Sequence, residues 1–344
     1  MKKYILFSLI LAFTWACTKT LDFDDNGVGN LIVLNSLISP DSCVSGRISQ
    51  STSILKGNRY GGVSEGSNIK GSVELYENGI KVGQINSVNG NFRFTEIKPK
   101  TGNTYRIVVT SNGKQADAET TIPNQVEVIS ADTTTIRNEW GNMLYFKIKF
   151  RDSSEKDYYR IVITNESMVR LTNLEDTIKT RYYINRYSGS FTSDDPVFKS
   201  VYNNFGSDII DMGPDNSYNI FPDDYFQGKD YFIQTWMSGF NNDYPTDNLT
   251  YFSHQVYSRR IIQVQKLSKG YYNYMKYLRL YEFYRDNPIS EPVPVYSNVK
   301  NGAGIFASFN DEAKFSFEKI YIPFSMDTIK VEKQQNGYNY GGGY

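Results

Sequence analysis

Short stretches in which hydrophobic and polar residues alternate recur along this chain, and turn residues separate them. Residues 104–110 put aromatic and aliphatic side chains on one face and polar ones on the other, and residues 144–151 do the same. Period-two alternation bounded by Asn-Gly turns is typical of half-buried antiparallel strands. The pattern predicts a mainly β fold in which residues 157–164 pair with 144–151 across a turn at 152–156. Further strands are expected at residues 31–37, 72–76, 90–94, 180–187, 230–237, 254–267 and 305–309.

One segment has the period of a helix instead. Ser268 offers an N-cap, and Pro288 forbids continuation. Between them, apolar and aromatic residues recur at spacings of three and four, namely Tyr271, Tyr274, Met275, Leu278 and Tyr281. We expect a helix near residues 269–285 that packs on a sheet, because a helix needs an apolar face to be stable. The alternative is that its tyrosines form a platform for a ligand.

These elements predict two β domains. Residues 30–123 fit an Ig-like or prealbumin-like β-sandwich that ends at Pro123, since short strands follow one another at close intervals. Residues 124–332 fit a second, larger β-sandwich-like domain that includes the helix. Residues 17–29 are polar and rich in Asp and Gly, which predicts a flexible tether. The remaining segments are expected to be irregular: a Gly/Ser-rich loop at 45–71, an insertion at 188–228 and a disordered tail at 333–344.

The N-terminal residues have the pattern of an export signal. Lys2 and Lys3 precede an apolar run over residues 4–13, and Cys17 follows shortly afterwards. The run covers only about half of the roughly 20 residues that a bilayer core requires, so it is too short to span a membrane. We interpret residues 1–16 as a lipoprotein signal peptide. Cys17 is then the residue that a bacterial lipoprotein pathway acylates, and it would anchor the protein to a membrane.

Two alternatives apply to Cys17. Thr14 and Ala16 also fit the small-x-small rule of an ordinary secretory signal at the same bond, and Trp15 is bulky for a lipoprotein signal. A disulfide with Cys43, the other cysteine of the chain, is conceivable in an exported protein. Acylation would consume Cys17 and leave Cys43 as a small buried apolar residue.

Composition narrows the classes of function. Lysine plus arginine and aspartate plus glutamate number 37 each, so no basic surplus would draw nucleic acid. The 28 tyrosines and 21 phenylalanines favour strands over helical bundles. The single histidine, His254, excludes histidine-rich metal sites. We interpret it as structural, because no serine-nucleophile signature lies nearby.

Carboxylates are the remaining candidates for chemistry. Adjacent pairs occur at Asp24/Asp25, Asp194/Asp195 and Asp223/Asp224, but neighbours in a strand point apart and no partner carboxylate can be assigned. Two sets of oxygen ligands could attract calcium, although neither has the spacing of an EF-hand loop, and we interpret both as solvated loops. These sets are Asp208, Asp211, Asp215 and Asn216, and Asn241, Asn242, Asp243, Asp247 and Asn248. We therefore assign no catalytic residue, cofactor or metal.

Several stretches in order resemble domain-of-unknown-function family 4249. The most specific is the Ser-Asn-x-x-x-Gly-x-Gly-x-Phe stretch at 297–306, and the Asp-Asp-x-Phe-x-Gly-Lys stretch at 223–229 is next. The others are Gly90-Asn91-Phe92, Gly102-Asn103-Thr104-Tyr105-Arg106, Asp157-Tyr158-Tyr159-Arg160, Phe221-Pro222 and the helix after Ser268. The resemblance implies a Bacteroidota outer-membrane lipoprotein, often encoded beside a TonB-dependent receptor, with no established activity. The glycines at 302 and 304 suit positive φ or close backbone approach.

Our leading hypothesis is a non-enzymatic accessory lipoprotein, held on the periplasmic or cell-surface face of the outer membrane by Cys17. It would assist ligand binding or uptake together with a TonB-dependent receptor. The alternatives are an extracellular carbohydrate-active enzyme that uses Asp or Glu side chains, and an adhesive or structural surface protein.

Overall fold

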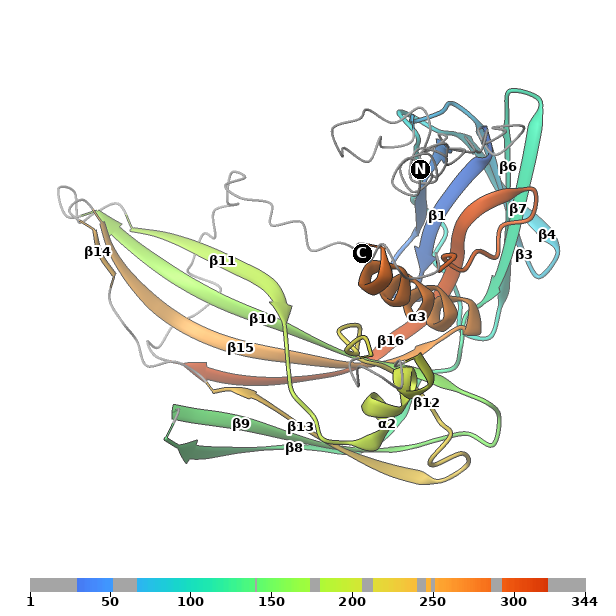
Figure 1. Ribbon diagram of the computed structural model, residues 1–344. Coiled ribbons are helices and arrows are strands. Elements are labelled where there is room, and N and C mark those ends of the chain that lie inside the picture. Colours follow the sequence, from blue (N-terminus) through green and yellow to red (C-terminus); the bar gives the residue numbers. More distant parts are fainter. Residues whose placement is uncertain are drawn as a thin grey trace, which may run out of the picture.

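The protein is mainly β, as its sequence predicts, and its strands form two adjoining parts (Figure 1). The computed structural model describes residues 30–51, 67–139, 141–173, 180–205, 213–239, 246–248, 251–285 and 293–320. The predicted signal peptide at 1–16, Cys17, the tether at 17–29 and the tail at 333–344 lie outside the described residues. No helix in the described part of the chain combines the length and the apolar character that crossing a bilayer requires.

The first part is a two-layer sandwich. One layer is a sheet in the order β4-β3-β6-β7, and the other is formed by β1, β2 and β5 at one end of the largest sheet. The strands are β1 (Ile32–Ile38), β2 (Val44–Gln50), β3 (Ser72–Glu77), β4 (Ile80–Asn86), β5 (Asn91–Phe94), β6 (Thr104–Ser111) and β7 (Lys114–Thr121). Alternate side chains of the strands fill its core, so Tyr105, Ile107 and Val109 are fully buried while Arg106 on the opposite face is exposed.

The second part contains longer strands. Its small sheet has the order β13-β9-β8, and the largest sheet of the molecule runs β11-β10-β15-β16-β1-β2-β5. The elements are β8 (Glu127–Asn138), β9 (Gly141–Arg151), β10 (Tyr158–Asn173), β11 (Thr180–Gly189), α2 (Pro196–Lys199), the 3-10 helix η2 (Ser200–Phe205), β12 (Ile220–Pro222), β13 (Asp230–Ser238), β14 (Thr246–Asn248), β15 (Tyr251–Leu267), α3 (Lys269–Tyr284) and β16 (Gly302–Ile320). Short β12 pairs with β10, and short β14 pairs with β15.

Strand β16 belongs to both parts. Its first seven residues pair in parallel with β1, and its later residues pair antiparallel with β15. Successive side chains of a strand point to opposite faces. Accordingly, Phe306 lies in the core of the sandwich, whereas Ile305 and Ala307 lie in the core of the second part. The division of the chain into two domains at residue 123 stays a prediction, since β16, the last described strand, contributes side chains to both cores.

The glycines of the Ser-Asn-x-x-x-Gly-x-Gly-x-Phe stretch allow this parallel pairing. Gly304 has a φ of +100°, and a Cβ there would lie 2.1 Å from the carbonyl oxygen of Leu34 in β1. Asn298 fixes the approach to the strand, because its Nδ2 donates to the Phe306 carbonyl at 2.7 Å and its Oδ1 accepts from the Phe306 N–H at 3.0 Å. The structural role predicted for this stretch is therefore confirmed.

Two predictions about strand pairing and loops are wrong. Strand β10 pairs with β11, β12 and β15 and not with β9, so residues 152–156 carry the chain from one sheet to the other instead of forming a hairpin turn. The Gly/Ser-rich segment at 45–71 includes most of β2, because Val44 and Ile48 alternate inward despite the polar residues between them. Local sequence does not distinguish a hairpin from a crossover when both strands are amphipathic.

Helix α3 begins where its N-cap predicts. The Ser268 side chain accepts from the Tyr271 N–H at 3.4 Å, and the helix packs against β16 (Figure 1). Its buried residues are Tyr271, Tyr272, Met275 and Leu280. The buried stripe is thus rotated from the predicted one, and Tyr281 is 41% exposed.

Candidate functional site

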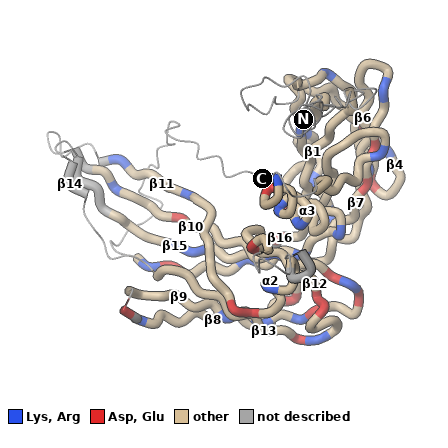
Figure 2. Tube along the Cα trace, viewed as in Figure 1, with Lys and Arg blue, Asp and Glu red and all other residues tan. Residues whose placement is uncertain are grey.

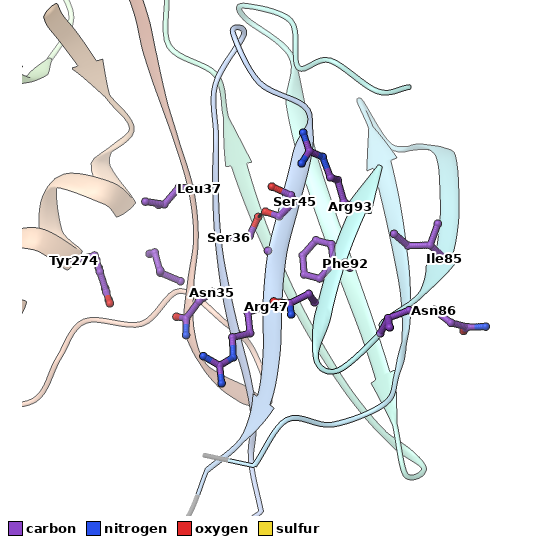
Figure 3. Close-up of a pocket in the computed structure, with 14 residues that line it drawn as sticks. Asn35, Ser36, Leu37, Ser45, Arg47, Ile85, Asn86, Phe92, Arg93 and Tyr274 are labelled. Carbon is purple, nitrogen blue, oxygen red and sulfur yellow. Dashed lines mark hydrogen bonds between the residues drawn. The ribbon is translucent and has the colours of Figure 1, made fainter. Parts of the chain in front are cut away.

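A groove of about 1020 Å³ lies along the sandwich layer made by β1, β2 and β5 and reaches past the edge of this layer to the end of β4 in the other layer (Figure 3). Fourteen of the described residues line it, and they come from these strands, from the end of β4 and the turn after it, from β16 and from α3. This size is typical of sites that hold small molecules or short oligomers.

The strand register sets which side chains face the groove. Asn35 of β1 lies opposite Arg47 of β2, and Arg47 lies opposite Asn91 of β5. The next outward row pairs Ser45 with Arg93. Because residues directly opposite in a sheet share a face, two guanidinium groups and several polar side chains come to one surface.

Both arginines are tethered at one nitrogen. Arg47 Nε donates to Asn68 Oδ1 at 2.9 Å, and Arg93 Nε donates to Cys43 Sγ at 3.0 Å. Cys43 is therefore half-exposed beside the groove, and the expectation that it is a buried apolar residue is wrong. The described residues that line the groove include these two arginines and no aspartate or glutamate. This described lining therefore carries positive charge.

Between the outward-facing Ser45 and Arg47, Gly46 leaves room for the sandwich core to pack closely behind the groove. A Cβ at this position would lie 2.6 Å from Cζ of Phe92 and 2.6 Å from the carbonyl oxygen of Asn35. The ring of Phe92, on the strand partner of Gly46, thus occupies the space that a side chain would take. On the neighbouring strand, Ser36 Oγ donates to the Ser45 carbonyl at 2.7 Å.

Helix α3 supplies the opposite wall. Figure 3 shows Tyr274 reaching from the helix toward the side of β1 that carries Leu37 and Asn35. Burial raises the pKa of Tyr274 above its ordinary value, so the phenol is neutral at pH 7 and offers a ring face and a hydroxyl. Of the predicted tyrosine stripe, only this residue lines the groove, whereas Tyr271 packs in the core.

The Asp223/Asp224 pair lies elsewhere, in a network of ion pairs where β10, β12 and the loop before β13 meet. Acidic and basic residues stand close together in this region (Figure 2). Asp223 is fully buried, accepts from Lys156 Nζ and from the Asp157 N–H at 2.7 Å, and so fixes the loop to the start of β10. Lys156 also pairs with Asp224, and Lys266 pairs with Asp157.

Asp152 extends this network. Its carboxylate accepts from the hydroxyl of Tyr159 and from the Gly228 N–H at 2.8 Å. Burial raises the pKa of Asp152, although these two hydrogen bonds act in the opposite direction. The Asp-Asp-x-Phe-x-Gly-Lys stretch therefore holds a loop against β10, and a structural role predicted for it is confirmed.

The other carboxylate pairs also have structural partners where they are described. Asp195 caps α2 by accepting from the Val197 N–H at 3.1 Å, and Asp194 pairs with Lys199 at 3.0 Å. Asp24 and Asp25 lie outside the described residues.

Neither candidate set of calcium ligands is assembled in the described part of the chain. Asp215 pairs with Arg279, and Asn216 hydrogen-bonds to Ile220 and Phe198. Asp208, Asp211 and residues 241–243 lie outside the described residues, as do the side chains of Asp247 and Asn248. No group of three or more potential metal ligands occurs among the residues that were placed. The backbone of His254 lies in β15 opposite Arg170.

Sequence reasoning missed the groove. Arg47 lies in a segment that we expected to be a loop, and Tyr274 is more than 200 positions away along the chain. Only the pairing of β2 with β1 and β5 brings these residues together, and the alternation of Val44 and Ile48 was the available signal.

Comparisons with known proteins place the chain in a family. Among solved structures, a crystal structure of a Bacteroides uniformis β-glucuronidase shows 10% identity and a TM-score of 0.16, over 61% of this chain and 30% of that chain. This chain thus spans less than a third of the length of that enzyme, and so weak a likeness carries no argument about fold or activity. Comparison with curated proteins gave no match. The family model described as "Domain of unknown function (DUF4249)" matches residues 18–314, which is most of the sequence. The chain belongs to the DUF4249 family.

Proposed function

We propose that this protein is a non-enzymatic accessory lipoprotein of the outer membrane that binds a ligand and assists its uptake with a TonB-dependent receptor. Cys17 would carry the lipid anchor, and residues 17–29 would link it to the sandwich. The proposal draws on the export signal before Cys17 and on what the family resemblance implies.

The observation that carries it is the groove on the sandwich. A trough of about 1020 Å³ with two arginines and several amide side chains suits binding. The described aspartate pairs that the enzyme hypothesis would use are instead engaged as a helix cap, ion pairs and loop contacts.

The anchor is tested by acyl labelling of the full chain in a bacterial host that has an outer membrane. Cys17→Ala should lose the label and release the protein from membranes, whereas Cys43→Ala, the matched cysteine control, should keep both. Unchanged membrane retention of Cys17→Ala would overturn the anchor.

The partner is tested by capture from detergent-solubilised envelopes of the source bacterium. A tagged chain should recover a TonB-dependent receptor that mass spectrometry identifies, and the tagged receptor should recover this chain in return. Repeated recovery of the chain without any such receptor would contradict the proposed role in uptake.

A further inference from the structure

We propose that the groove binds an acidic oligosaccharide, whose carboxylates pair with Arg47 and Arg93. This inference rests on the proposed function, because it names the ligand class of the groove that carries that function.

The charge of the groove calls for an anion. Arg47 and Arg93 are diagonal neighbours on paired strands, a spacing that long side chains bridge. Each uses its Nε in one hydrogen bond, Arg47 to an amide oxygen and Arg93 to a cysteine sulfur. Within the described residues, no ion pair joins either guanidinium to a carboxylate, and their hydrogen bonds use only Nε, so the terminal nitrogens of both remain to bind a ligand. Guanidinium groups bind carboxylates with paired, charge-assisted hydrogen bonds.

The floor of the groove disfavours an acidic peptide. Strand β1 lies between β16 and β2, and β2 lies between β1 and β5, so the ladders already engage the backbone of both strands. Strand β5 ends the sheet, but it is only four residues long and its first residue, Asn91, already forms a backbone bridge with Val88. A peptide that binds by strand addition needs a free sheet edge. Recognition here therefore depends on side chains.

Those side chains suit a sugar. Asn35 and Asn91 present amides, and Ser45 presents a hydroxyl, groups that can donate to and accept from sugar hydroxyls. Tyr274 on the opposite wall offers a ring for the apolar face of a sugar unit. The geometry thus combines neutral hydrogen-bonding groups, an aromatic wall and two cations, which matches a chain of sugars that carry carboxylates.

Titration calorimetry of the full-length protein in a detergent without sugar groups tests the proposal. The probes are hexagalacturonate, the neutral match maltohexaose and the acidic peptide hexaglutamate. We expect hexagalacturonate to bind at least about tenfold more tightly than either other probe, and to weaken as NaCl is added. Arg47→Gln and Arg93→Gln should each weaken it about tenfold or more, because each removes a charged hydrogen-bond donor.

Arg106→Gln is the matched control. Arg106 is also exposed on the sandwich, but it lies on β6 in the other layer and pairs with Asp117 at 3.2 Å. The Arg106→Gln substitution should change the affinity for hexagalacturonate by less than twofold. The proposal is overturned if hexagalacturonate does not bind, if the groove variants bind it like the control, or if hexaglutamate binds as tightly.

The chain has carboxylates of its own at Asp22, Asp24 and Asp25, and a control variant tests whether they compete with the ligand. A variant with Asp22, Asp24 and Asp25 changed to Asn should bind hexagalacturonate as the natural chain does. Binding seen only in that variant would mean that the chain's own segment fills the groove, and would overturn an external ligand. All these measurements use purified protein, so failure to capture a receptor leaves their result unaffected, and the two proposals fail separately.

Discussion

Gly304→Ala should destabilise the protein far more than an exposed loop glycine replaced in the same way. Gly304 sits in β16 with a φ of +100° where the strand runs beside β1. Gly79, in the turn between β3 and β4, is a matched control, because it also has positive φ (+83°) but a Cβ there meets nothing within 4 Å.

The two substitutions share a backbone cost and differ in a steric one. Holding an L-residue in a left-handed conformation costs about 1–2 kcal/mol in both variants. At Gly304, the added Cβ would lie 2.1 Å from the carbonyl oxygen of Leu34, well inside contact distance, so β1 and β16 must separate locally. Each buried backbone hydrogen bond broken in that way costs about 1–3 kcal/mol. Gly304→Ala should therefore lower the free energy of unfolding by at least about 2 kcal/mol more than Gly79→Ala.

Urea unfolding of the two variants and the natural protein measures this difference. Far-UV circular dichroism follows all strands, and tryptophan fluorescence follows the second part, because the only tryptophan in its placed strands is Trp236. The comparison is valid where the two transitions coincide and the slopes with urea agree. Equal destabilisation by Gly304→Ala and Gly79→Ala would refute the close-approach argument.

Two further predictions concern buried carboxylates. Asp223→Asn should lower the free energy of unfolding by about 2 kcal/mol, because it weakens hydrogen bonds to a fully buried charge. Asp224→Asn, at a side chain that is 64% exposed, should lower it by less than about 1 kcal/mol. Equal effects of the two substitutions in thermal unfolding would contradict this prediction. Burial opposes ionisation of Glu166 most strongly, but hydrogen bonds from Arg186 and Tyr257 prevail and lower its pKa below the ordinary 4.5. The ionised form therefore stabilises the fold above pH 4.5, and this contribution is lost as pH falls through the lower folded value. Glu166→Gln should accordingly destabilise the protein at pH 7 and much less at pH 3, and an equal effect in urea at both pH values would count against it.

The sequence predicted where the strands and the helix lie much better than it predicted which strands pair with one another. Alternation placed Phe146 and Ile148 in a buried row, and the Ser268 cap placed the start of α3, because both signals depend on a few neighbouring residues. Pairing is different, since it depends on which distant strand offers a complementary face. The amphipathic strands β9 and β10 looked like a hairpin, yet each pairs with strands of a different sheet.

The groove could not be predicted for the same reason. Arg47 and Arg93 are unremarkable in the sequence, and they share a surface only because β5 pairs with β2. By contrast, the glycine stretch at 302–304 was informative, because two backbones that approach closely leave no room for a side chain and so require glycine.

The continuity of β16 has a mechanical consequence. Tension applied at the N-terminal end of β1 reaches the second part of the molecule through the parallel ladder that joins residues 32–38 to residues 302–308. Both strands run in the same direction, so such a pull loads the rungs of the ladder together in shear instead of peeling them apart one by one. A force applied to the sandwich is thereby transmitted through β16 to β15 and the rest of the second part. Single-molecule pulling from residue 30 should show a high rupture force that Gly304→Ala lowers.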